Sequence, residues 1–99
     1  MKETTIPHEQ SLENRRIGVV AIIVNEPDKA HDRLNKILHD FSHIIIGRLG
    51  VPYRERNLSI ISLIIDGNTD DVGAMTGRIG QLPGLTVKSA FAKNPPKAN

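Results

Sequence analysis

Two short runs of aliphatic residues, Arg16–Val24 and Leu58–Ile65, are apolar at almost every position. Both are too short for a typical helix, and both are rich in the β-branched residues that favour strands. A strand that is apolar on both faces either is covered on both or exposes an aliphatic surface to water. These two runs therefore predict the central strands of one small sheet, and they limit the folds that the rest of the chain can adopt.

Two segments that follow the apolar runs have helical periodicity instead. The first begins at Pro27, which fits the first turn of a helix, and its apolar residues recur on one stripe, so a helix is predicted over Asp28–Ser42. The second is predicted to begin with Thr69 as its N-cap and to end at the Pro83–Gly84 break. Each helix presents one apolar stripe and can therefore cover one face of a sheet.

The two remaining apolar segments have the features of edge strands. Ile44–Tyr53 is interrupted by Gly47 and Gly50, which predicts an irregular or bulged strand, and Leu85–Phe91 alternates apolar and polar residues. The element order is then β-α-β-β-α-β. It predicts an α+β, ferredoxin-like fold, a four-stranded antiparallel sheet with two helices on one face and the two aliphatic strands in its centre.

The same topology leaves one face of the sheet uncovered. Because both helices lie on one side, the outward aliphatic residues of the two central strands have no partner within the chain. A large exposed aliphatic patch usually marks an interface. We therefore expect a homo-oligomer that forms through the open sheet face, most simply a twofold dimer.

The chain has 99 residues, which is enough for one domain. The distribution of apolar and polar residues along the chain predicts a flexible arm over 1–15, an ordered domain over 16–92 and a disordered tail over 93–99, because neither end carries periodic apolar residues. No segment resembles a signal peptide or has the apolar length of a membrane span. There is also no cysteine, so we expect a cytoplasmic protein without thiolate chemistry or membrane contact.

One candidate ligand site gathers around the predicted second strand. Arg48, Gly50, Tyr53 and Arg54 bring positive charge, close backbone approach and one amphipathic ring into a short segment. They predict a ligand-binding site at a subunit boundary, near the end of the first helix. Arginines grouped in this way can hold phosphates, although a few such contacts give weak and salt-sensitive binding. The alternative is a solvated strand edge whose arginines pair with nearby carboxylates.

A second candidate is a metal site, which would make a divalent metal the cofactor. His39 and His43 are four residues apart on the predicted first helix, a spacing at which two imidazoles can chelate a divalent metal from one helix face. A helical wheel places both histidines opposite the apolar stripe, and no third ligand is adjacent in sequence. A solvated helix surface is therefore the alternative, and the sequence itself requires no cofactor.

The predicted second helix contains Gly73, Gly77 and Gly80 at spacings of four and three residues. This spacing places them on one face, where the absence of a Cβ lets another backbone approach closely. The approaching partner is either the sheet of the same chain or another subunit. A phosphate-binding loop is excluded, because no strand leads into the glycines at the required spacing and no Lys-Ser/Thr pair follows them.

Several motifs, most of them in the second half of the chain, resemble one protein family. They are RLGVPYRE at 48–55, NLSIISLIIDG at 57–67, GAMTGRIG at 73–80 and PGLTVKS at 83–89. Over 16–91 the chain resembles the iron-only hydrogenase system regulators. The resemblance implies an ACT-like, ferredoxin-like fold similar to the ligand-binding domain of nickel-responsive regulators. It also implies an oligomer and a role in transcriptional regulation linked to hydrogenase genes, and it brings no catalytic residues.

We therefore expect a regulatory protein of the iron-only hydrogenase system and not an enzyme, since no nucleophile elbow or oxyanion loop accompanies the serine and histidine side chains. Two alternatives stay open: a small-ligand or metal sensor that acts through a partner protein, and a purely structural assembly domain. Specific DNA binding by this chain alone is not expected. The roughly fifteen residues before the domain are too few for a helix-turn-helix.

Overall fold

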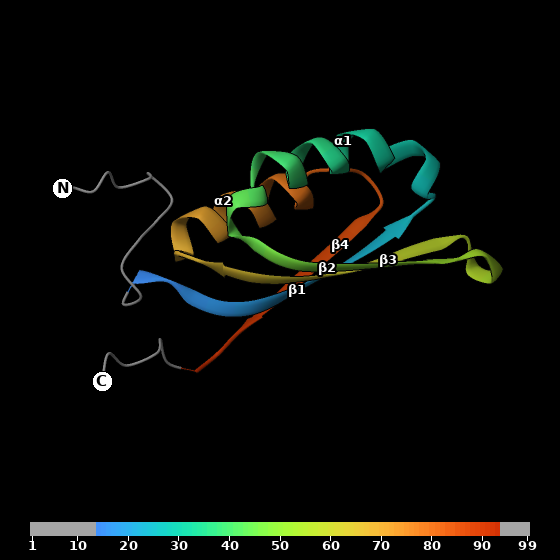
Figure 1. The fold of residues 1–99 in the computed structure, drawn as a ribbon. Helices are drawn as coiled ribbons and strands as arrows, with labels where there is room; N and C mark the ends of the chain where they lie inside the picture. Colours follow the sequence, from blue (N-terminus) through green and yellow to red (C-terminus); the bar gives the residue numbers. More distant parts are fainter. Residues whose placement is uncertain (1–13, 94–99) are drawn as a thin grey trace.

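The computed structural model describes residues 14–93, and over this range the chain forms four strands and two α-helices in the order β-α-β-β-α-β (Figure 1). They are β1 Arg16–Asn25, α1 Pro27–Asp40, β2 Ile45–Tyr53, β3 Leu58–Gly67, α2 Thr69–Gly80 and β4 Leu85–Phe91. Two short 3-10 turns, η2 over Ser42–Ile44 and η3 over Arg54–Arg56, flank β2. The predicted arm and tail fall largely on residues 1–13 and 94–99, outside the described range.

The strands form one antiparallel sheet in the order β2-β3-β1-β4. The predicted ferredoxin-like fold, with the first and third strands in the centre, is therefore confirmed. The register of β1 and β3 places Val19 opposite Ile64 and Val20 opposite Leu63. The centre of the sheet is thus aliphatic on both sides, as the two apolar runs require.

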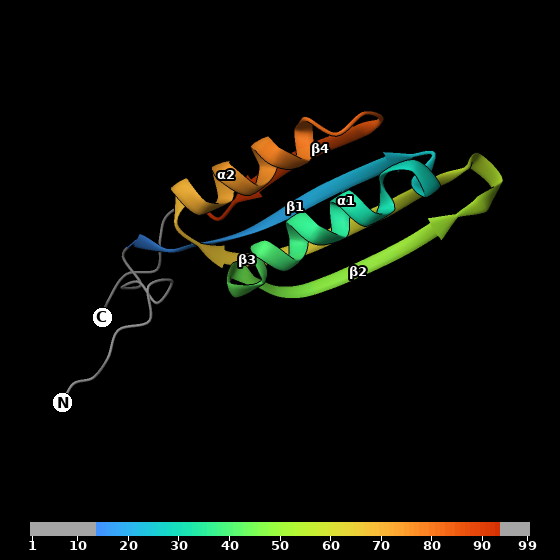
Figure 2. The same cartoon turned by 90° about the horizontal axis from the view of Figure 1, so that it is seen from above.

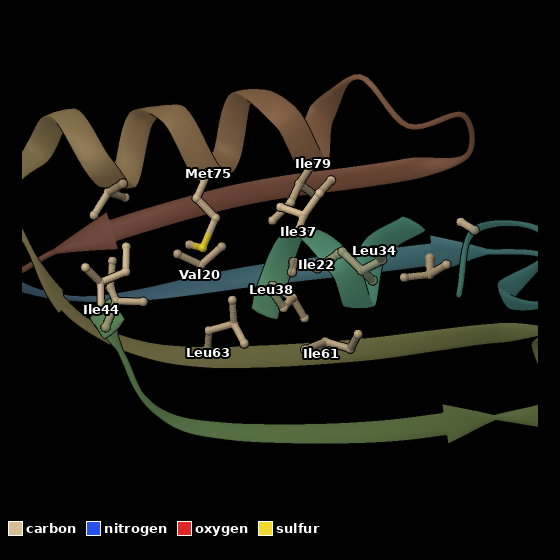
Figure 3. Close-up of a cluster of buried hydrophobic side chains, with 14 residues drawn as sticks. Val20, Ile22, Leu34, Ile37, Leu38, Ile44, Ile61, Leu63, Met75 and Ile79 are labelled. Atoms are coloured by element: carbon tan, nitrogen blue, oxygen red, sulfur yellow. The ribbon is translucent and has the colours of Figure 1, made fainter. Parts of the chain in front are cut away.

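Both helices lie on one side of the sheet (Figures 1 and 2). The core between the layers combines residues from β1, β3 and both helices (Figure 3). Its fully enclosed members include Val20, Ile22, Leu63, Met75 and Ile79. Burial of each such side chain contributes roughly 1.5–3 kcal/mol, which makes this layer the main source of stability.

The starts and ends of the helices differ from the predictions for local reasons. α1 ends at Asp40 rather than Ser42, because the chain tightens there into the 3-10 turn η2. Asn68 and not Thr69 is the N-cap of α2, since Asn68 Oδ1 accepts the Asp71 N–H at 2.7 Å. α2 also ends at Gly80, ahead of the predicted proline break.

β3 extends beyond the apolar run Leu58–Ile65, because Asp66 and Gly67 also belong to the strand. Gly67 pairs with Arg16 on β1, and a Cβ built on it would lie 2.8 Å from Ile44 Cγ2. The glycine therefore serves close packing of Ile44 against the strand. The predicted irregularity of β2 is confirmed by a register shift between Ile45 and Gly47.

The glycines of α2 do not form one surface that packs on the sheet. Apart from adjacent residues and the backbone of α2 itself, a Cβ built on Gly73 or Gly77 would meet no heavy atom within 4 Å, whereas one on Gly80 would lie 3.6 Å from Val87 Cγ1. The sheet of the same chain is therefore excluded as the partner of Gly73 and Gly77, which lie on the exposed side of the helix.

Alanine at Gly73 or Gly77 is expected to raise the free energy of unfolding by roughly 0.5–1 kcal/mol each, because alanine favours the helix and its Cβ meets open space. Alanine at Gly67 is the contrasting variant. Its Cβ would lie 2.9 Å from Ile44 Cβ, so the free energy of unfolding is expected to fall by about 1–3 kcal/mol. Urea unfolding followed by circular dichroism measures both changes, and a loss of stability at Gly73 would contradict the expectation.

Candidate functional site

Among the described residues, no helix or strand covers the side of the sheet that faces away from α1 and α2 (Figure 1). The strand register and the side-chain alternation place eight large apolar residues on it, each between 39% and 64% exposed. They are Ile17, Val19 and Ile23 of β1, Leu49, Val51 and Tyr53 of β2, and Ile60 and Ile64 of β3. We call this surface the open face. An apolar surface spread over three adjacent strands is unusual for a monomer.

The open face carries little charge, and the charge that it has lies at its margins. Lys88 stands opposite Ala21 on the edge strand β4. Asp66 stands opposite Ile17 at one end and is paired with Arg15, at 3.5 Å between Oδ1 and Nε. No other strand residue that the described register places on this face is charged. A second apolar surface can therefore cover the centre without burying an unpaired charge.

The helix side of the sheet holds a groove of about 580 Å³, bounded by the N-terminal half of α1 and by β2, η3 and β3. We call it the α1–β2 groove. Val24, Leu34 and Ile61 supply apolar lining, and Asp28, Arg48 and Arg54 bring charge to it. This volume and this mixture of apolar surface with a few polar groups are typical of small-molecule sites.

The groove exists because β2 presents compact residues where it passes α1. Gly50 and Pro52 are opposite Ile61 and Ser59 in the register, on the helix side of the sheet. A Cβ built on Gly50 would have Ile61 Cγ1, at 4.0 Å, as its nearest neighbour, so the space above this glycine is open. Figure 2 shows β2 running along the outer side of α1, and the groove lies along this side.

Arg48 is held beside the groove by a chain of hydrogen bonds from α1. Its Nη2 donates to Asn35 Oδ1 at 3.0 Å, and Asn35 Nδ2 in turn lies 3.1 Å from His31 Nε2. These two hydrogen bonds, both at the surface, orient the guanidinium, which still has further N–H donors.

The structure brings together three of the four residues that were predicted to bind a ligand. Arg48, Gly50 and Arg54 line the α1–β2 groove. Tyr53 is opposite Leu58 in the register and on the side of β2 that belongs to the open face, so it is separated from the other three. The groove lies beside the N-terminal half of α1, whereas the sequence analysis predicted a site near the C-terminal end of this helix.

Two polar residues of the groove, His31 and Asn35, were not among the predicted site residues. Their spacing of four places them on one ridge of α1, which the sequence does indicate. This ridge faces Arg48 because of the orientation of α1 on the sheet. No signal in the sequence predicts that orientation.

The two predicted metal ligands do not share a helix ridge. Because α1 ends at Asp40, His39 lies in its last turn while His43 lies in η2. His43 Nε2 is 3.5 Å from Asp71 Oδ2, and the imidazole stacks beside the Phe41 ring. Within residues 14–93, no group of three or more His, Asp or Glu side chains is arranged to hold a metal ion.

Other charged residues make contacts away from the groove. Arg78 Nη2 lies 3.2 Å from Asp40 Oδ2, a pair that links α2 to the end of α1. At the start of α1, Lys29 Nζ lies 2.8 Å from Oε1 of Glu26, the N-cap residue. This hydrogen bond and the attraction between the two charges lower the pKa of Glu26 and raise the pKa of Lys29. Neither pair occupies the groove or the open face.

These features define a class: a ferredoxin-like α+β domain with an uncovered sheet face and a groove between its first helix and an edge strand. In the described part of the chain, neither helix is long and apolar enough to cross a membrane. The chain belongs to the TM1266-like family, which is described as "Iron-only hydrogenase system regulator, putative" and matches residues 16–89. The resemblance found in the sequence is thus confirmed.

Comparison with solved structures agrees with this assignment. The uncharacterized protein TM1266 from Thermotoga maritima is 38% identical, with a TM-score of 0.77, and the match covers 80% of this chain and 99% of that one. No curated protein sequence matches this chain.

Two more distant structures share the fold alone. A functionally unknown protein from Pediococcus pentosaceus is 15% identical, with a TM-score of 0.53, over 86% of this chain and 99% of that one. A formyltetrahydrofolate deformylase from Pseudomonas putida is 9% identical, with a TM-score of 0.55, over 75% of this chain and 28% of that enzyme.

Proposed function

We propose that this chain is a non-catalytic, ACT-like regulatory module of the iron-only hydrogenase system that works as a homo-oligomer in transcriptional control. The observation that carries the proposal is the open face, an aliphatic surface over three strands that no other element within residues 14–93 covers. Membership of the regulator family supplies the physiological context. Assembly through the open face and control of gene expression are the parts that need testing.

A second copy of the chain is the occupant that fits the open face. The centre of the face is aliphatic on both central strands, where Val19 is opposite Ile64 and Ile23 is opposite Ile60. A twofold contact there places aliphatic side chains against aliphatic side chains, and its charged groups stay at the margins. Homodimer interfaces are characteristically this apolar.

Action through a partner protein is the route that the described residues favour. α1 and α2 are separated by two strands and both pack on the sheet, so residues 14–93 present no helix-turn-helix. The whole chain has a formal charge of only +2, which is little for a chain that would hold DNA by itself.

Loss of the gene is expected to change the transcript levels of iron-only hydrogenase genes several-fold in the organism that carries it. The wild-type chain supplied in trans should restore them. An Ile64→Lys chain, which places charge at the centre of the open face, should not restore them although it folds. Unchanged hydrogenase transcripts in the deletion strain would contradict the regulatory role, and full restoration by Ile64→Lys would contradict the need for assembly.

The purified chain alone is expected to leave hydrogenase promoter DNA unshifted in a gel at physiological salt, because it lacks a reading helix within its described residues. A matched DNA fragment of scrambled sequence is the control. Sequence-specific retention at nanomolar protein would show direct regulation and would remove the need for a partner.

A small-ligand sensor is the second candidate function, and the α1–β2 groove favours it. The groove has the volume of a small-molecule site and an arginine that two helix residues hold in place. A native mass spectrum of protein purified without chelator reports the subunit number and any bound small molecule together. A purely structural assembly domain would give an oligomer whose mass equals that of its subunits, with no bound small molecule.

A further inference from the structure

We infer that the α1–β2 groove binds a small organic carboxylate with a short aliphatic body, and that Arg48 receives the carboxylate group. The inference rests on the sensor function proposed above and specifies the chemical class of its ligand. Its support comes from the distribution of charge in the groove, the geometry of Arg48 and the apolar lining.

Charge is distributed unevenly between the two walls of the groove. The strand wall carries Arg48 on β2 and Arg54 on η3, and the helix wall carries Asp28 in the first turn of α1. Both arginines stay charged at any physiological pH. An anionic group in the groove is therefore attracted to the strand wall by two charges and repelled from the helix wall by one.

The geometry of Arg48 suits a carboxylate. A guanidinium is planar and can donate two parallel hydrogen bonds to the two oxygens of one carboxylate. The hydrogen bond to Asn35 occupies one donor of the five, and Asn35 is itself held by His31. Arg48 is thus positioned before a ligand arrives, which reduces the side-chain entropy that binding costs.

The apolar lining of the groove calls for an aliphatic body on the ligand. Pro27 and Pro52 line the groove and keep part of their carbon surface exposed. The core residues Val24, Leu34 and Ile61 also border it but are only 2%, 3% and 7% exposed. An inorganic anion at Arg48 would leave this lining in contact with water. Each methylene that covers it is expected to increase affinity by about fourfold.

Titration of the ¹⁵N-labelled full chain with sodium hexanoate tests the inference by NMR. Hexanoate is expected to give saturable shifts of the His31, Gly50 and Ser59 amides, with a dissociation constant on the order of 1 mM. Acetate lacks the aliphatic body and hexanamide lacks the charge, so each should bind at least tenfold more weakly. Equal binding of hexanamide, or shifts confined to open-face residues such as Val19, would overturn the inference.

Substitutions with opposite expected signs test the roles of the charged groups. Arg48→Gln should weaken hexanoate binding about tenfold or more, since a charge-assisted pair is lost. Asp28→Asn should strengthen it about two- to threefold, because a like charge is removed. Arg33→Gln is the matched control, on the exposed surface of α1 outside the groove. Unchanged affinity in Arg48→Gln, or weaker binding in Asp28→Asn, would contradict the assignment.

The Ile64→Lys chain separates this inference from the proposed assembly. Ile64 lies on the side of the sheet opposite the groove, so the variant should bind hexanoate as the wild-type chain does. Loss of binding in this variant would contradict a groove that is complete within one chain. Absence of hexanoate binding by an intact oligomer would overturn the ligand class and leave the regulatory function standing.

Discussion

A lysine in place of Ile64 is expected to convert the oligomer into folded monomers. Ile64 lies at the centre of the open face, opposite Val19, and is 46% exposed in the single chain. Burial of an ammonium group there against a second aliphatic surface costs on the order of several kcal/mol, because Asp66, the carboxylate two residues along the same face of β3, is already paired with Arg15. Size-exclusion chromatography with light scattering at micromolar concentration measures the change in mass.

The matched control places the same charge on a helix. Ala74 of α2 is exposed on the other side of the molecule, so Ala74→Lys should leave the oligomer intact. Both variants should keep a cooperative thermal transition, because each lysine replaces a residue that is exposed in the single chain. A wild-type protein that is monomeric at micromolar concentration, or an Ile64→Lys variant that stays oligomeric, would contradict assembly through the open face.

Alanine in place of Leu63 is expected to lower the free energy of unfolding by about 2–5 kcal/mol. Leu63 is fully buried on the central strand β3, opposite Val20, and lies below α1 in the core (Figure 3). The substitution removes the burial of its side chain and leaves a cavity between tightly packed elements. A domain of this size has about 5–15 kcal/mol of stability in all, so much of it is lost.

Urea unfolding measures this loss, and Leu63→Met is its control. Methionine keeps most of the side-chain volume, so its cost should stay below about 1.5 kcal/mol. A similar loss for alanine and methionine would show that strand preference or local strain decides the stability at this position. A loss below about 1 kcal/mol in Leu63→Ala would contradict the described core.

The element order and the sheet topology could be predicted because two apolar runs and two helical stripes leave few arrangements. The run Leu85–Phe91 is predicted and observed with the same limits, since its alternation and the preceding Pro83–Gly84 define both ends. Helix ends and the extent of β3 depend instead on tertiary contacts. Gly67 lies outside the predicted apolar run, whereas in the fold it belongs to β3 and makes room for Ile44.

The candidate site could be predicted only in part, because a groove is made by two elements at once. Arg48 and Gly50 could be grouped from sequence, and the period of two along a strand is the signal that separates Tyr53 from them. The contribution of α1 to the groove follows from its path over the sheet, which composition and periodicity do not determine. His39 and His43 were predicted to share one face of the first helix, but α1 ends at Asp40, between the two histidines.

The uncovered sheet face has a consequence for how the protein persists in a cell. When assembly covers the open face, the folded state is stabilised by mass action, and its melting temperature rises with protein concentration. A newly made chain at low copy number is then the most vulnerable to proteolysis, and each added copy protects the others. In a protein that assembles through the outward side chains of β1, β2 and β3, as we propose, expression level and lifetime are coupled.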